Sequence, residues 1–190
     1  MTLPAQSLRT PEAPVDVLVI RARDGDRWAR SALYRRFAEP VAAYLVRLVG
    51  NRDDALDLLH DTYVYAFERL DELRDSTRFR AWLYRIATNF ARTRLRRRRW
   101  LRAIGFVQPT EAVSWESMSH DASPETTAEL RQLEAMAKRL PIDERIVWVL
   151  RRVEGCTMPE IAAYVECSLA TAKRRLQRAE ARMKSMLGTP

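Results

Sequence analysis

Apolar residues recur at every third or fourth position along several long stretches of this chain. Residues 28–49, residues 55–70 and the stretch that begins at Phe79 would each place one apolar stripe along a helix. The pattern of residues 15–23 fits a strand or a helix, and we favour a helix because no partner strand is evident. The periodicity therefore predicts a first helical domain over residues 15–102.

Helix-breaking and helix-capping residues mark boundaries inside this domain. The Gly-Asn pair at 50–51 tolerates left-handed backbone angles and should end one helix. Asp53 or Asp54 can cap the next helix. Leu56 falls on the apolar stripe of that helix, so we expect it in the core. Pro40 lacks an amide donor and would kink or divide the helix that contains it.

A second helical set follows a segment without helical period. Residues 103–124 hold prolines and serines and predict a flexible linker, as residues 1–14 predict a flexible arm. Helical spacing returns over residues 125–188, where the stretch 157–160 (TMPE) matches a capping box. Ser168 should cap a long last helix. The inner face of that helix is expected to carry Leu176, Ala179, Met183 and Leu187.

The short helix after residue 157, a three-residue turn and the long basic helix together predict a helix-turn-helix, with a plain three-helix bundle as the alternative. Arginine on the outer face can bond a guanine edge through two parallel hydrogen bonds, or hold a phosphate. Glycine is usual in the turn, but here Glu166 precedes Cys167. A non-glycine residue in the left-handed region costs about 1–2 kcal/mol, so another turn geometry stays open. The Glu166 carboxylate would also weaken binding to nearby DNA.

Composition agrees with an all-α fold of two helical domains joined by a flexible acidic linker. Only five glycines are present, and 47% of the residues are hydrophobic, which is enough for a packed core. No stretch approaches the length of an apolar membrane span, and the N-terminus lacks the apolar segment of a secretory signal. Two cysteines without a paired framework fit a reducing cytosol.

Charge adds a functional expectation. The chain carries a net charge of +8, and seven arginines lie within residues 92–102. A core cannot bury that much charge, so it must face water or a polyanion, and a phosphate backbone suits such a cluster best. Large aromatics lie just upstream and could stack bases. Residues 103–129 hold five acids and no lysine or arginine, so an acidic spacer separates two basic regions.

Two separate blocks of sequence resemble one family. The block LYRRFAEPVAAYLVRLVGNRDDALDLLHDTYVYAFERL, followed by FRAWLYRIATNFARTRLRRRR, looks like region 2 of the extracytoplasmic-function (ECF, group IV) sigma factors. The block LPIDERIVWVLRRVEGCTMPEIAAYVECSLATAKRRLQRAEARM looks like their region 4. The resemblance covers residues 16–188. It implies a protein that binds bacterial core RNA polymerase and directs initiation at promoters.

The resemblance assigns roles in region 2. Asp57, His60 and Asp61 match the positions that dock on the clamp helices of the polymerase β′ subunit, although His60 stands where the family usually has glutamine. The loop 71–78 resembles one that captures a flipped-out base, which becomes readable once it is unstacked. Residues on the polar face of the next helix match positions at the melted −10 strand. The −10 set is Arg85, Asn89, Arg92, Arg96, Arg97, Arg98 and Arg99.

The resemblance also assigns roles in region 4 and names partners. The last helix would read the −35 duplex. The implied partners are core polymerase, through the β′ clamp helices and the β flap, promoter DNA, and an anti-sigma factor. The linker resembles segments along the RNA exit path, and the protein would be cytoplasmic and nucleoid-associated or held at the inner membrane by the anti-sigma factor. The −35 set is Ser168, Thr171, Lys173, Arg174, Arg175 and Arg178.

Other functions fit the sequence less well. No phosphate-binding loop, dinucleotide fingerprint or HExxH motif supports an enzyme, and no cofactor or metal site is expected. Cys156 and Cys167 are interpreted as small buried hydrophobes. The serious alternative is a helix-turn-helix regulator that binds duplex DNA without polymerase. Such a protein has no need of the aromatic and arginine-rich helix. A protein-interaction scaffold without DNA is the weaker alternative.

Overall fold

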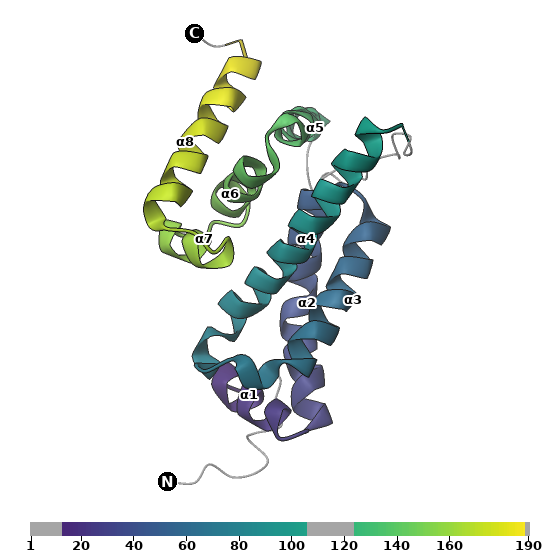
Figure 1. Cartoon of the computed structure of the whole chain (residues 1–190), viewed down its shortest axis with the longest axis vertical. Helices are drawn as coiled ribbons and strands as arrows, with labels where there is room; N and C mark the ends of the chain where they lie inside the picture. The colour runs from purple at the N-terminus through teal and green to yellow at the C-terminus, as the bar shows by residue number, and fades with distance from the viewer. Residues whose placement is uncertain (1–12, 106–123, 189–190) are drawn as a thin grey trace.

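The computed structural model describes residues 13–105 and 124–188, and every regular element in these two ranges is helical (Figure 1). This confirms the all-α prediction for the described part of the chain. Most of the expected arm and nearly all of the expected linker lie outside the described residues. The α-helices are α1 (Val15–Arg23), α2 (Arg27–Val49), α3 (Arg52–Glu68), α4 (Phe79–Ala103), α5 (Pro124–Arg139), α6 (Ile142–Arg152), α7 (Met158–Tyr164) and α8 (Leu169–Met186).

Local sequence accounts for the ends of α2 and α3. The Asp26 carboxylate accepts from the backbone N–H of Trp28 at 2.8 Å and so caps α2. Gly50 ends α2 at φ 69°. The prediction that Asp53 or Asp54 caps α3 was wrong, because Asn51 does so by accepting from the Asp54 N–H at 2.8 Å. Both aspartates lie inside the first turn instead.

Pro40 does not divide α2, which runs without a break from Arg27 to Val49. The prediction for Leu56 was also wrong, because its side chain is 47% exposed. Leu58 and Leu59 are buried, so the inward stripe of α3 lies to one side of Leu56. Leu56 lies instead on the outer face of α3.

The second helical region begins with α5 and ends with the predicted helix-turn-helix of α7 and α8. Thr157 and Glu160 form the expected capping box: the Glu160 carboxylate accepts from the Thr157 N–H at 2.8 Å. The Ser168 hydroxyl accepts from the Thr171 N–H at 3.1 Å and caps α8. Glu166 takes the left-handed conformation at φ 52°, so the turn keeps the geometry that normally favours glycine.

The inner face of α8 follows the prediction only in part. Ala172, Ala179 and Met183 are buried, and Leu176 packs against the core from a partly buried position. Leu187 was expected there as well, but it is 51% exposed just after the helix ends. On the other side of α8, Lys173, Arg174, Gln177 and Arg178 are exposed, so this side of the helix is available to a partner.

The two helical regions pack against each other in the described chain, with α6 and α7 against α2 and α4 (Figure 1). Tyr84 of α4 stacks on Tyr164 of α7 with ring centroids 5.3 Å apart, and both rings are almost fully buried. Tyr44 lies on the other side of Tyr84, and its hydroxyl donates to Thr88 Oγ1 at 2.9 Å, because the Thr88 hydroxyl itself donates to the Tyr84 carbonyl. Aromatic contacts thus join the core of the first helical region to the helix-turn-helix.

No helix in residues 13–105 or 124–188 combines the length and the apolar character that crossing a membrane would require.

Candidate nucleic-acid and protein interfaces

One face of α4 gathers an amide and several guanidiniums, as the sequence predicted. Arg85, Asn89, Arg92 and Arg96 follow one another at spacings of four, three and four, so they lie on the same side of the helix. Arg92 Nη1 donates to Asn89 Oδ1 at 2.8 Å, which fixes the orientation of the amide. The guanidiniums of this face can donate hydrogen bonds to phosphates or bases. The Asn89 amide can both donate to a base and accept from one.

A cavity of about 320 Å³ opens beside this face. Arg85 and Asn89 line it together with the aromatic rings of Tyr65, Trp82 and Phe90. The rings of Tyr65 and Phe90 meet edge to face with centroids 5.8 Å apart. Aromatic walls with an amide and a guanidinium at the rim suit an unstacked base, which can stack on a ring and bond through its edge.

The sequence did not point to Tyr65. Its position on α3 lies off the buried stripe, and its ring is 37% exposed. An aromatic residue that is exposed on an otherwise polar helix face is the signal that could have singled it out. The other contributors from outside α4 are Glu72, in the short 3-10 helix Leu70–Glu72, and Glu166, in the turn between α7 and α8.

The loop that was expected to capture a base is held against α1. The Nη2 atom of Arg23 donates to the carbonyl of Leu73 at 2.5 Å and to that of Leu70 at 3.3 Å. Leu73 is buried, and Asp75 caps the second short helix, Ser76–Arg78, by accepting from the Thr77 N–H at 3.0 Å. Arg23 therefore holds the first part of the loop, residues 70–73, against α1, and Glu72 of this part lines the cavity.

The structure divides the arginine run between two sides of α4. Arg96 and Arg99 continue the face of Asn89, whereas Arg94 and Arg98 point to α3, where Asp54 lies 2.6 Å and 3.4 Å from them. The prediction that the whole run must face water or a polyanion was thus wrong for Arg94 and Arg98, and also for Arg92, which is 15% exposed and bonds Asp143. Arg97 lies on the α3 side as well and lines a cavity with Asp54.

The predicted residues of α8 fall into three groups. Ser168 and Thr171 use their hydroxyls in the cap, where they lie 2.9 Å apart. Arg175 is half-buried and faces α6. The remaining three are exposed and make no ion pair within the described ranges. These three are Lys173, Arg174 and Arg178.

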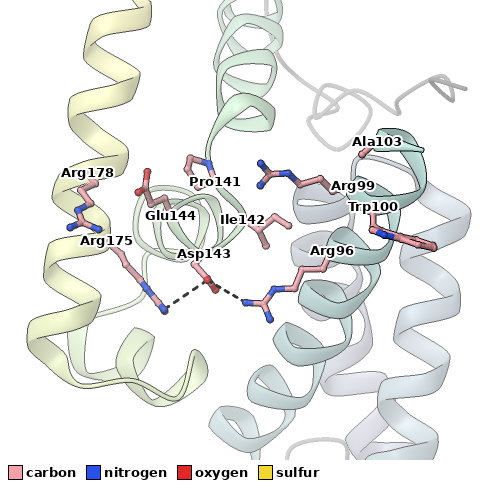
Figure 2. Close-up of a pocket in the computed structure, with 10 residues that line it drawn as sticks. All are labelled: Arg96, Arg99, Trp100, Ala103, Pro141, Ile142, Asp143, Glu144, Arg175 and Arg178. Atoms are coloured by element: carbon pink, nitrogen blue, oxygen red, sulfur yellow. Dashed lines mark ion pairs between the residues drawn. The ribbon is translucent and has the colours of Figure 1, made fainter. Parts of the chain in front are cut away.

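Asp143, in the first turn of α6, lies between the two basic helices (Figure 2). Its carboxylate accepts from Arg92 Nε at 3.0 Å and lies 3.5 Å from Arg96 and 3.8 Å from Arg175. An open cavity of about 680 Å³ surrounds this cluster, with Arg99 and Trp100 on its α4 side. No local sequence pattern indicated that α4 and α8 would both contact the Asp143 carboxylate.

An acidic and partly apolar surface covers the outer side of α3. Asp57, His60 and Asp61 are all exposed, so the structure brings the three predicted docking residues together. Leu56 and Val64 lie among them and are 47% and 43% exposed. Apolar side chains framed by charges are typical of a protein-binding surface.

The two cysteines differ in their surroundings, and Cys167 adjoins both Glu166 and Ser168 in the turn between α7 and α8. Cys156 is buried, and burial raises the pKa of its thiol to about 11, which keeps it protonated near neutral pH. Cys167 is partly exposed, and both thiols are free. No cluster of three or more histidine, cysteine or acidic side chains that could hold a metal occurs in the part of the chain that the structure describes.

Comparisons with known proteins place the chain in one family. The chain matches the family models for sigma-70 region 2 over residues 33–101 and sigma-70 region 4 over residues 130–183. The curated ECF RNA polymerase sigma-E factors of Salmonella typhimurium and Escherichia coli are 33% identical over 170 residues, which cover 86% of this chain and 88% of each relative. The sigma-E factor of Haemophilus influenzae is 30% identical over 175 residues, covering 85% of this chain and 89% of its own.

Two solved structures share the fold. CnrH in complex with the cytosolic domain of CnrY is similar with a TM-score of 0.67 at 24% identity, over 92% of this chain and 97% of that chain. The sigma factor RpoE in complex with the anti-sigma factor NepR from Bartonella quintana is similar with a TM-score of 0.65 at 22% identity, over 83% and 96%. With its helix-turn-helix and basic α4, the chain belongs to the ECF sigma factors, the RNA polymerase subunits that direct promoter-specific transcription.

Proposed function

We propose that α4 reads the melted −10 strand, that α8 reads the −35 duplex and that α3 docks on core polymerase. The observation that carries the proposal is the aromatic cavity beside Asn89 and Arg85, because a duplex-only regulator has no use for a site shaped for an unstacked base. The same chain also presents a helix-turn-helix with exposed guanidiniums. One polypeptide would then contact two promoter elements in two different states of the DNA.

On α4, the two sides of the arginine run have different tasks in this proposal. Arg96 and Arg99 extend the Asn89 face and would hold the phosphates that follow the melted base. Arg98 donates to Asp54 and to the Val49 carbonyl, so we assign it a structural role that ties α4 to α2 and α3. Arg97 is exposed and stays a candidate for backbone contact on the α3 side.

On α8, the hydroxyls and the guanidiniums would also act differently. Ser168 and Thr171 cap the helix and orient its first turn toward the groove. Arg174 and Arg178 are free to reach base edges, whereas Lys173 would contact phosphate as a point charge. Arg175 can contribute only after it leaves Asp143.

On α3, Asp57, His60 and Asp61 would meet basic residues of the polymerase clamp, and Leu56 with Val64 would supply the apolar centre of the contact. The β flap is the expected partner of the second helical region. We assign residues 15–102 to region 2 and residues 125–188 to region 4.

The protein would work in the bacterial cytoplasm, where core polymerase and the nucleoid are found, and it would act by binding rather than by catalysis. Both structural relatives described above were solved in complexes that contain a second chain, and one of these is named an anti-sigma factor. A regulator of that kind, soluble or held at the inner membrane, is therefore the further expected partner.

Reconstitution tests the function directly. The full chain is mixed with bacterial core polymerase and a promoter library, and initiation is measured by sequencing the 5′ ends of the transcripts. We expect the chain to join core polymerase and to start transcription at a defined set of sites with common −35 and −10 sequences. A chain that binds duplex DNA but neither joins core polymerase nor starts transcripts would instead be a helix-turn-helix regulator.

Replacing Asn89 by alanine is expected to change which −10 sequence the holoenzyme prefers. The reason is that the amide can both donate a hydrogen bond to a base edge and accept one from it. We expect a loss of about 1–3 kcal/mol in discrimination at one −10 position, with core binding unchanged. The measurement is initiation from promoters that vary only in the −10 element.

The matched control is Gln132→Ala, which removes an exposed amide from α5, away from the proposed DNA surfaces. Uniform weakening on every −10 sequence in the Asn89 variant would argue that the amide contacts only the backbone.

A further inference from the structure

A further cavity lies where the end of α4 meets the connection between α5 and α6. Its volume is about 380 Å³, which falls within the range of small-molecule sites. Leu95 of α4 lines it together with Leu140, Pro141 and Ile142 around the start of α6, so part of the lining is apolar. The rest of the lining consists of six cationic side chains: Arg98, Arg99, Arg102, Lys138, Arg139 and Arg145.

The lining of this cavity differs from that of the two other arginine-rich cavities beside α4. Asp143 and Glu144 line the cavity between α4 and α8, and Asp53, Asp54 and Asp57 line the cavity on the α3 side. The arginines of those two cavities therefore face anionic side chains of the same chain. No carboxylate of the described residues lines the cavity at the start of α6, so its positive charge is left for an anion from solution.

The ion pairs around the cavity use only some of its cations. Lys138 Nζ lies 2.5 Å from the Glu134 carboxylate, and Arg98 Nη1 lies 3.4 Å from that of Asp54. The other exposed cations make no ion pair and donate no hydrogen bond within residues 13–105 and 124–188. These are Arg99, Arg102 and Arg139. Figure 2 shows the Arg99 side chain extended from α4 toward Pro141, so a guanidinium reaches across from one helix to the other wall.

Arg145 contributes a buried charge to the same lining. It is 6% exposed, its Nη2 donates to the Arg47 carbonyl at 2.9 Å, and its Nε has no hydrogen-bond partner among the described residues. Burial lowers the pKa of Arg145 to about 10; the Glu134 carboxylate opposes this shift and the Arg98 charge adds to it. A buried guanidinium with an unused donor is costly, and an anion in the cavity would offset that cost.

The amount of charge indicates the class of anion. A single phosphate carries about two negative charges near neutral pH, so it would leave most of the six cations unpaired. Two or three linked phosphates match the lining better, because each guanidinium can bond two phosphate oxygens at once. The volume and the apolar part of the lining leave room for a nucleoside on the same ligand.

We propose that the cavity between the end of α4 and the start of α6 binds a small polyphosphate anion of the nucleoside triphosphate class. Arg99, Arg102 and Arg139 would hold the phosphates from the exposed side, and Arg145 would complete the set from the buried side. The nucleoside would lie against the apolar lining. This site is a property of the free chain and does not depend on the proposed promoter contacts. Since Arg99 also belongs to the proposed −10 face, the tests use the other residues.

Titration calorimetry of the full chain tests the ligand class. The probes are ATP, inorganic tripolyphosphate, AMP and adenosine in magnesium-free buffer at about 0.15 M salt, which screens exposed charges more than about 8 Å apart. We expect one ATP per chain, bound at least about tenfold more tightly than AMP, and no binding of adenosine. Several weak sites per chain, or equal binding of ATP and AMP, would overturn the proposal. Tighter binding of ATP than of tripolyphosphate supports the nucleoside, and equal binding contradicts that part.

Removing two exposed cations tests the place of binding. Arg102→Ala combined with Arg139→Ala should lower the affinity for ATP at least about tenfold and leave the fold intact, since neither side chain has a partner within the described ranges. Arg35→Ala combined with Lys184→Ala is the matched control, because it removes the same charge from exposed sites on α2 and α8. An equal loss in both double variants would reveal general attraction to a basic protein. An equal loss in binding to a promoter DNA probe would assign the two arginines to the DNA surface. Either result contradicts the proposed site.

Thermal unfolding with and without ligand tests Arg145. A ligand that binds only the folded chain raises the midpoint of unfolding, so each variant serves as its own reference for stability. In Arg145→Met the rise caused by saturating tripolyphosphate should fall to less than about half of that in the unmodified chain. Val147→Ala, a change in the core on the same helix, should lower the midpoint but keep the full rise. An undiminished rise in Arg145→Met, or an equally diminished one in Val147→Ala, would show that the Arg145 guanidinium does not bind the ligand.

Discussion

Reversing the charge of Asp57 and Asp61 together is expected to abolish stable association with core polymerase. Both carboxylates are exposed on the outer side of α3, within one turn of each other and beside the exposed Leu56 and Val64. Arginines at these two positions would place positive charge against the basic partner that an acidic surface selects, and like charges across an interface cost several kcal/mol. We expect at least about a hundredfold loss in affinity, or about 3 kcal/mol, measured by fluorescence anisotropy with labelled protein.

The fold should tolerate this double variant, since neither carboxylate takes part in an ion pair within the described ranges. Glu39→Arg on α2 is the matched control, because it makes the same type of charge reversal at an exposed site outside the proposed interface. If the double variant and the control bind core polymerase equally, the docking surface is not on α3. Leu56→Ala, made alone in the unmodified chain, should also weaken binding to core polymerase without lowering the midpoint of thermal unfolding. This result would distinguish a contact residue from a core residue.

Local sequence predicted the helices and most of their ends because caps act over three or four residues. The capping box at Thr157 and Glu160 and the cap at Ser168 were both read correctly, since their partners lie one turn away. Asn51 was taken only as the end of α2, although its side chain starts α3. A short connection between two helices leaves one residue to serve both ends, and spacing alone does not say which side chain bends back.

The edges of an apolar stripe were harder to predict than its centre. Leu56 and Leu187 both fit a helical period, yet both are about half exposed. A residue at the border of the stripe turns inward only if a neighbouring helix covers it, and sequence periodicity does not contain that neighbour. On α3 the error is informative, because an exposed leucine between acids marks the surface that we assign to polymerase.

The arginine run shows where charge density misleads. Arg94 and Arg98 find Asp54, which lies 40 and 44 residues earlier in the chain, so no local pattern joins them. The helical period itself separates them from Arg92 and Arg96, which lie on the opposite side of α4. A count of seven arginines therefore overstates the number that can contact DNA from one face. The contact of Asp143 with both basic helices was equally beyond local reasoning, because it depends on how two regions pack.

Replacing Arg174 and Arg178 together by alanine is expected to remove most −35-dependent binding of the holoenzyme. The two side chains are one turn apart on the outer face of α8, exposed, and free of ion pairs within residues 13–105 and 124–188. A bidentate contact of arginine with guanine is worth about 1–3 kcal/mol, so two such contacts predict a loss of roughly a hundredfold or more. Quantitative footprinting on a promoter with an intact −35 element measures it.

Lysine at the same two positions separates base reading from phosphate contact. Lysine keeps the charge but cannot form the planar pair of hydrogen bonds, so the double lysine variant should retain the salt dependence of binding and lose discrimination between −35 sequences. Lys184→Ala removes an exposed cation from the last turn of α8 and should change neither property by more than about twofold. If the lysine variant discriminates as well as the unmodified chain, α8 holds the backbone through these residues and the −35 sequence is read by other groups on the helix.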